Sequence, residues 1–423
     1  MKVIRYRIYF LQSLNLCARE TNLSFVSLQL IIELRPRLGS ANAFYKTSKQ
    51  VENVLITADG HIILNDSSFA WPSEYGQISS ESLHNVTKIP EGGVTFRLRF
   101  KNANFSLLNS GQSLKVQRKF RLPCGIPSST SMENSKCTIF CASCKNEFNE
   151  IQVKRFLPLP SIDWKDEVQD WFCGCHHPTK KECSSSESNR NLHTKGVAPR
   201  QSDLLYSSGF VRFYYPDQQQ RMATTTQDPD SEVKKAEVSC DKCLAPLGTF
   251  SVGEKMMHVW HHTVIIMSEK IDKLPLSSCQ LASETFLMVI GGICSEHDWI
   301  PLKIRLMNAS HQPKLSLFIW MLEPDLKLLS TDEKSSALGA KSVLKVMFRQ
   351  EIEDGSENFQ KQQPEKLQSK KLSAQVDQEL EIPLSVLKAG LESLEMSMEW
   401  IPPHQRQDSD FSIGYIDLSP VIQ

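Results

Sequence analysis

The chain has 423 residues, which is enough for two or three domains with sizeable hydrophobic cores. Hydrophobic residues make up 40% of it and charged residues 23%, a balance typical of globular rather than disordered proteins. Lysine plus arginine equals aspartate plus glutamate at 48 each, so no basic surplus points to nucleic acid as a direct partner.

The sequence contains no run of some eighteen apolar residues, so we expect no membrane-spanning helix and no membrane partner. The first twenty residues lack the uninterrupted apolar stretch of a secretory signal, because Arg5, Arg7, Gln12 and Asn15 break it. We therefore expect a cytoplasmic or nuclear protein, or one found in both places. Its twelve cysteines then stay reduced, which favours metal binding over disulfides at Cys-x-x-Cys pairs.

The N-terminal part is expected to be a β-rich domain over residues 28–136, preceded by a poorly defined extension over 1–27. Short alternating or β-branched runs separated by turn residues are typical of a sandwich or half-barrel. They predict strands that begin at residue 28 and lie at 54–57, 61–64 and 94–100. The residues expected to face the core in the last of these are Val94, Phe96, Leu98 and Phe100.

Residues 137–249 carry two Cys-x-x-Cys pairs about a hundred residues apart: Cys141, Cys144, Cys240 and Cys243. Each pair places two thiolates on one tight turn, which is half of a tetrahedral zinc site. Two pairs together complete a four-cysteine site with no open coordination position, so the predicted zinc is structural. The alternatives are pairs of buried or surface thiols, and a redox role for which the thioredoxin-like strand-then-helix context is missing.

A rigid arm is expected between the two pairs. Pro158 and Pro160 make a stiff, extended stretch, because each proline fixes its own φ and restrains the residue before it. A short helix capped by Ser161 or Asp163 would follow and run through Gln169. Trp164 and Trp171 would share one face of that helix.

The arm delivers four candidate metal ligands within five residues: Cys173, Cys175, His176 and His177. Three interpretations stay open. The first is a second zinc site, or thiols packed beside the two tryptophans; the second is a catalytic thiol. The third is a ligand donated to the metal centre of a partner protein. The next segment, about 183–237, is rich in polar residues and is expected to be a surface loop or disordered, except for a strand-like run at 210–215.

Residues 250–423 are expected to form a second β-rich domain. Strands are predicted at 264–267, 285–290, 304–306, 315–322 and 342–348, a mobile loop at about 351–375, and a helix at 384–394. We expect His258, His261 and His262 to lie on the solvated surface. The predicted fold is thus mainly β (α+β), with two β-rich domains joined by a split four-cysteine zinc-binding segment and few helices.

The central motifs resemble one known family. The combination of Cys141-x-x-Cys144, the arm RFLPLPSIDW, the Cys/His turn at 171–178 and Cys240-x-x-Cys243 is similar to the HECT-like ubiquitin-conjugating-enzyme-binding proteins, also described as E3 ubiquitin-protein ligases. The strand-like runs ELRPRLGSA at 33–41, LFIWML at 317–322 and VLKVM at 343–347 extend the resemblance from about residue 28 to near the C-terminus.

The resemblance implies binding to a charged ubiquitin-conjugating enzyme, a HECT-like C-terminal half that accepts ubiquitin, and ubiquitylation of substrates and of the protein itself. It also implies an alternative, non-enzymatic role as inhibitor or chaperone of the metallo-endonuclease of pre-mRNA 3′-end processing. In that role Cys175 beside His176 would cap the metal centre, with Cys173 as the rival. The partner-binding residues implied are Pro158, Pro160, Trp164, Trp171, Cys175 and His176.

A HECT-type transfer needs a thiolate that forms a thioester with ubiquitin. The residues after Cys294 contain no cysteine, so the end of the chain cannot supply one. The candidates are then Cys279, Cys294, Cys173 and Cys175. Otherwise the chain only binds and positions its partners.

Overall fold

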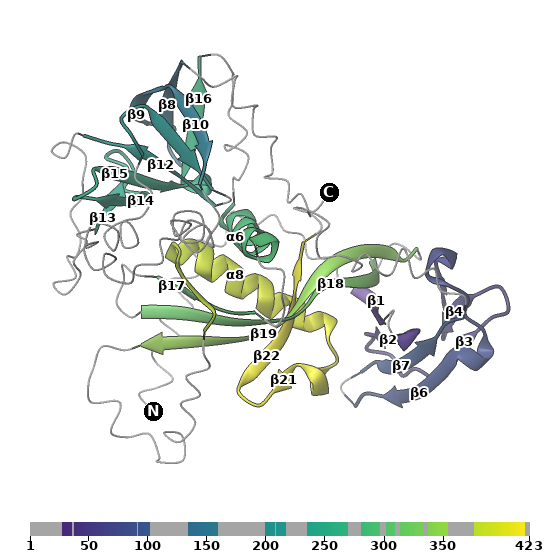
Figure 1. Ribbon diagram of the computed structural model, residues 1–423. Coiled ribbons are helices and arrows are strands. Elements are labelled where there is room, and N and C mark those ends of the chain that lie inside the picture. Colours follow the sequence, from purple (N-terminus) through teal and green to yellow (C-terminus); the bar gives the residue numbers. More distant parts are fainter. Residues whose placement is uncertain are drawn as a thin grey trace, which may run out of the picture. The chain divides into compact units, whose positions relative to one another are not determined.

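The computed structural model describes residues 28–35, 38–90, 92–101, 134–159, 199–207, 209–216, 235–269, 281–296, 302–308, 314–332, 337–353 and 376–418 (Figure 1). These residues are mainly in strands, with two α-helices, which confirms the predicted mainly β fold. No helix in this part of the chain is long and apolar enough to cross a membrane. The predicted extension at 1–27 lies outside the described residues, as does most of the predicted loop at 351–375.

Contacts divide the chain into two units: residues 1–108 with 328–340, and residues 109–327 with 341–423. The first is called unit 1 and the second unit 2. The three segments expected from the sequence, with boundaries near 137 and 250, stay a prediction.

Unit 1 consists of two small sheets that share one core. Its strands are β1 (Leu28–Arg35), β2 (Ser40–Tyr45), β3 (Val54–Ile56), β4 (His61–Leu64), β5 (Ser67–Ala70), β6 (Leu83–Lys88) and β7 (Val94–Arg99). The first sheet has the order β1-β2-β7-β6, with the end of β18 (Lys314–Asp332) beside β1, and the second has the order β3-β4-β5. Alternate residues of β7 are buried between the sheets, as the pattern predicts.

The half of unit 2 that carries the two cysteine pairs is also built from two sheets around one core. The three-stranded sheet contains β16 (Val264–Ser268), β8 (Ser135–Cys141) and β9 (Glu147–Val153), in that order. The six-stranded sheet contains, in order, β10 (Arg155–Pro158), β11 (Asp203–Tyr206), β12 (Phe210–Tyr214), β15 (Met256–Trp260), β14 (Pro246–Ser251) and β13 (Lys235–Ser239). The insertion expected at 183–237 is therefore not a loop throughout, since β11, β12 and the start of β13 lie in it; only β12 is predicted by the sequence.

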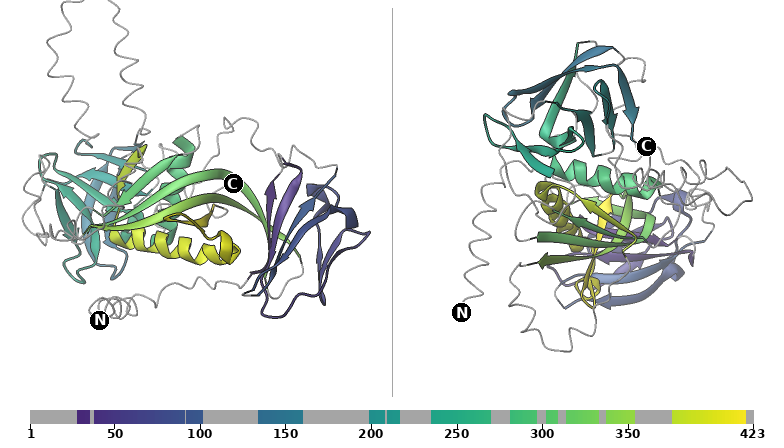
Figure 2. Two further views of the ribbon diagram at one scale, coloured as in Figure 1. Left: turned by 90° about the horizontal axis from the view of Figure 1, so that it is seen from below. Right: turned by 60° about the vertical axis from the view of Figure 1, so that its left-hand side comes forward.

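The rest of unit 2 is a sheet covered by two helices. Its strands are β17 (Lys303–Met307), β18, β19 (Gly339–Glu353), β20 (Gln378–Glu381), β21 (Gln407–Asp408) and β22 (Phe411–Asp417). The order is β21-β22-β19-β18, with β17 beside β18 and β20 parallel to β17. Figure 2 shows β18 and β19 running side by side, and the helices are α6 (Ala282–Glu296) and α8 (Leu384–Ser397).

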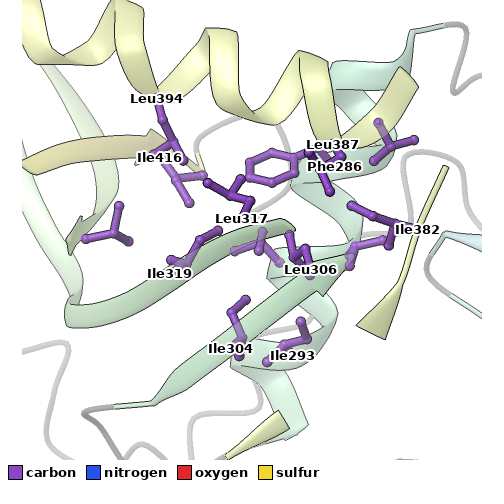
Figure 3. Close-up of a cluster of buried hydrophobic side chains, with 14 of the residues drawn as sticks. Phe286, Ile293, Ile304, Leu306, Leu317, Ile319, Ile382, Leu387, Leu394 and Ile416 are labelled. Atoms are coloured by element: carbon purple, nitrogen blue, oxygen red, sulfur yellow. The ribbon is translucent and has the colours of Figure 1, made fainter. Parts of the chain in front are cut away.

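The two helices and the sheet share one hydrophobic cluster (Figure 3). Phe286 of α6 lies against α8, and Ile293 of α6 lies beside Ile304 of β17 in the same cluster. The helix predicted at 384–394 is confirmed as α8. The strand predicted at 285–290 is wrong, because this apolar run lies inside α6, where its side chains are buried at helical spacing against α8 and the sheet.

Candidate metal centre

Each Cys-x-x-Cys pair occupies the turn of a β-hairpin. The first joins β8 to β9 and the second joins β13 to β14. The two turns have the same backbone hydrogen bonds. The Cys141 amide donates to the Asn146 carbonyl at 2.8 Å and the Cys240 amide to the Ala245 carbonyl at 2.9 Å. Two segments distant in sequence thus present their thiols on matching loops.

The residue after each pair reverses the chain. Lys145 and Leu244 both have φ of 59°, in the left-handed region that side-chain-bearing residues seldom adopt. In this conformation the Lys145 amide donates to the Cys141 carbonyl and the Leu244 amide to the Cys240 carbonyl, each at 2.9 Å. The closed turns hold both sulfurs of a pair on the same side of the loop.

The four sulfurs form one cluster, as the spacing predicts. They all lie within 4.8 Å of one another. The sulfurs of Cys141 and Cys243 are 3.7 Å apart and those of Cys144 and Cys240 are 3.6 Å apart. A tetrahedral zinc with bonds of about 2.3 Å would separate its sulfurs by about 3.8 Å. The expectation that the two pairs come together is confirmed, and the all-sulfur set fits zinc, although occupancy by zinc stays a prediction.

The thiols of the cluster differ in proton affinity. The pKa of Cys144 is lowered to about 7, mainly because the Asn146 amide donates to its sulfur. The Ala245 amide acts in the same direction on Cys243, but burial and hydrogen bonds to the other thiols outweigh it and raise the pKa of Cys243 to about 12. Crowded thiols cannot all lose their protons unless a cation balances the charge, which a divalent metal would supply.

Two further cysteines of the described residues lie outside the cluster, and neither is in a disulfide. Cys137 is buried in β8, and desolvation raises its pKa. Cys294 is half-buried on α6, packs against the core that α6 shares with α8, and has its sulfur 3.7 Å from that of Met321. Cys137 therefore lacks the lowered pKa of an activated nucleophile, and Cys294 lacks its full exposure.

Most of the other predicted site residues lie outside the described part of the chain. These are Pro160, Trp164, Trp171, Cys173, Cys175, His176 and Cys279, so the thioester candidates among them and the capping role of Cys175 stay predictions. The base of the arm is described. It is β10, which pairs in parallel with β11 from Arg155 to Pro158. The Arg155 guanidinium donates to both carboxylate oxygens of Asp203, at 2.8 and 2.6 Å, and so fixes the first residue of the arm.

The expectation that three histidines lie on the solvated surface is wrong, since His258 and His262 are half-buried and His261 is buried. The His261 side chain is 2% exposed, and its Nε2 lies 2.8 Å from the Ser207 carbonyl. His262 bridges to both helices, with Nδ1 3.1 Å from Thr285 Oγ1 and Nε2 3.3 Å from Ser385 Oγ. Burial lowers the pKa of both histidines to about 4, so they are neutral here. The sequence does not predict the burial of His261, because the residues that bury this side chain come from other segments.

Comparison with known proteins gives two related curated sequences, both named as E3 ubiquitin-protein ligases. The mouse (Mus musculus) protein is 26% identical over 208 residues, which are 47% of this chain and 47% of the mouse protein. The rat (Rattus norvegicus) protein of the same name is 23% identical over 196 residues, 45% of this chain and 44% of the rat protein. The matches thus span about half the length of these relatives.

No solved structure shows a significant match to this chain. The model of one family, however, matches residues 33–413, a range that runs through both units and includes both cysteine pairs. This chain therefore belongs to the family described as HECT-like ubiquitin-conjugating enzyme (E2)-binding proteins.

Proposed function

We propose that this protein is an E3 ubiquitin-protein ligase that binds a charged E2 and promotes ubiquitin transfer to substrates and to itself. The observation that carries the proposal is the family match over residues 33–413, because E2 binding is what defines that family. The names of the mouse and rat relatives support the same role. The cytoplasm, the nucleus or both would be its place of action.

We propose direct transfer from the E2 rather than a thioester on the cysteines that the structure describes. Cys137 packs in a hydrophobic core, Cys294 is half-buried against another, and the other four described cysteines form the cluster. In direct transfer an acceptor lysine amine attacks the thioester carbonyl of the E2–ubiquitin conjugate. The new bond is an isopeptide bond, and the cysteine thiolate of the E2 leaves. The ligase then contributes by holding the two reactants in position.

The test combines the full chain with a set of E2 enzymes charged with ubiquitin. We expect at least one E2 to bind and ubiquitin to become attached to this chain through bonds that resist reducing agent. Uncharged E2 is the control for attachment. Absence of both binding and attachment across the set would contradict the proposed function.

The same assay distinguishes a thioester from direct transfer. An adduct that disappears on reduction, and that is lost in one of Cys173→Ala, Cys175→Ala, Cys279→Ala or Cys294→Ala, would show transfer through that cysteine. We expect Cys294→Ala to leave attachment unchanged, because its half-buried thiol packs against the core beside Met321.

A further inference from the structure

Leu244 has an exposure that the fold does not explain. Its side chain is 71% exposed, more than that of any other large hydrophobic residue in the described part of the chain, of which Leu38 follows at 62%. It comes directly after the last cysteine of the cluster, at the tip of the hairpin that joins β13 to β14. A single exposed leucine is common on protein surfaces. Its backbone conformation and the rigidity of its loop therefore decide whether it indicates a function.

The backbone at Leu244 is better suited to glycine. Its φ of 59° is one that glycine adopts freely and that a β-carbon disfavours. Lys145 occupies the matching position of the first hairpin with the same φ and the same backbone hydrogen bond. A solvated lysine is ordinary there, whereas a leucine exposes apolar surface at a strained position. The side chain therefore gains nothing from the fold that would favour it over glycine.

The loop that carries Leu244 is held firmly. Cys240 and Cys243 join it to the first hairpin through their sulfur contacts, and the Asn146 side-chain amide donates to Asp241 Oδ1 at 2.8 Å across the two loops. A side chain on such a loop loses little conformational freedom when it is bound. The charged residues of the two loops and their edges balance, with two of each sign: Lys145, Glu147, Asp241 and Lys242. A partner would thus be held here by apolar contact rather than by charge.

We propose that Leu244 is the apolar anchor of the surface that docks the E2, where it enters an apolar recess of that enzyme. The inference rests on the proposed function, since the family is defined by E2 binding and the matched residues include this hairpin. A leucine that becomes buried on binding favours association, because its apolar surface is removed from water. Pro246, exposed two residues further on, extends the apolar surface.

The experiment compares Leu244→Gly with Lys145→Gly in the full chain. Both variants relieve the same backbone strain, so both should retain the metal content and at least the melting temperature of the parent protein. Only Leu244→Gly removes the proposed anchor. We expect it to raise the Kd for the E2 by about tenfold or more, the effect of losing one buried leucine. Lys145→Gly should leave the Kd unchanged, and added salt should change the parent's Kd little.

Several outcomes would overturn the inference. If the parent binds the E2 and Leu244→Gly binds it equally well, the anchor is elsewhere and the proposed function stands. If both glycine variants weaken binding alike, the loop backbone rather than the leucine is responsible. If Leu244→Gly abolishes self-association in sedimentation but leaves E2 binding intact, the surface belongs to a second copy of the chain. If the parent binds no E2, the proposed function and the inference both fail.

Discussion

At the scale of single residues, each sulfur of the cluster should be needed to join the two hairpins. We predict that Cys141→Ser lowers the zinc content from about one ion per chain to a small fraction of that, because three ligands rarely hold structural zinc. Metal-binding energy counts as folding energy in such sites, so the free energy of unfolding should fall by at least several kcal/mol. Metal analysis of the purified protein and denaturant unfolding would measure the two effects.

The matched control is Cys137→Ser. Cys137 lies in the same strand, β8, and in the same core as Cys141, but outside the cluster. We expect its replacement to reduce stability by about 1–2 kcal/mol, the cost of burying a hydroxyl, and to leave the zinc content unchanged. Equal zinc content in the parent and in Cys141→Ser would show that the cluster is not a zinc site.

The sequence predicts single residues well where chemistry is local. Two thiols on a tight turn are recognisable from spacing alone, and their pairing followed from the need for four ligands. The left-handed backbone of Leu244 and the burial of His261 were not predictable in the same way. The first depends on how a turn closes, and the second depends on Ser207, which comes from a separate segment.

At the scale of elements, the contact between α6 and α8 depends on the absence of a side chain at Gly390. A β-carbon there would lie 2.4 Å from the ring of Phe286, which is itself buried and cannot move aside freely. We predict that Gly390→Ala lowers the free energy of unfolding by about 1–3 kcal/mol, although alanine is the better helix former. Denaturant unfolding of the variant would measure the loss.

Two further variants make this test specific. Glu392→Ala, at an exposed position of the same helix, should change stability by less than about 0.5 kcal/mol. The double variant Gly390→Ala with Phe286→Leu should lose less than the sum of the two single changes, because the smaller side chain makes room for the added methyl group. Strict additivity would contradict the proposed contact.

The two helices also show what periodicity can and cannot predict. The leucines of α8 repeat at helical spacing, and the helix lies where this pattern places it. The run at 285–290 has six consecutive residues that are apolar or β-branched, a pattern that a buried strand and a buried helix share. Only the continuation to Ile293, one further turn along the same buried face, distinguishes the two.

At the scale of the whole molecule, the sequence predicts the fold class but little of the pairing. β1 pairs with the end of β18, and the Leu30 amide donates to Thr331 Oγ1 across 301 residues of sequence. Alternation shows which residues face a core, but it does not show which distant strand lies beside them. The cysteine pairs are the exception, because a shared metal requires two remote segments to meet.

Unit 2 should lose stability in acid where the two sheets that carry the cysteine pairs meet helices α6 and α8. His261 is buried there as a neutral side chain. Its pKa is about 4 in the folded protein and about 6.5 in an unfolded chain. Above pH 6.5 both states are neutral at this site. As pH falls from 6.5 towards 4, only the unfolded state takes up the proton, so stability decreases; below 4 the loss stops growing.

We therefore predict that the fall in unfolding free energy between pH 7 and pH 5 is smaller by about 2 kcal/mol in His261→Gln than in the parent protein. Glutamine keeps an N–H donor for the Ser207 carbonyl and does not titrate. His404→Gln, at an exposed histidine, is the control and should follow the parent profile. His262 is present in all three proteins, and the charge of His261 contributes to the lowering of its pKa, so the difference reports the titration of His261 together with this coupling. A His261→Gln profile parallel to that of the parent would mean that this histidine is not held neutral by burial.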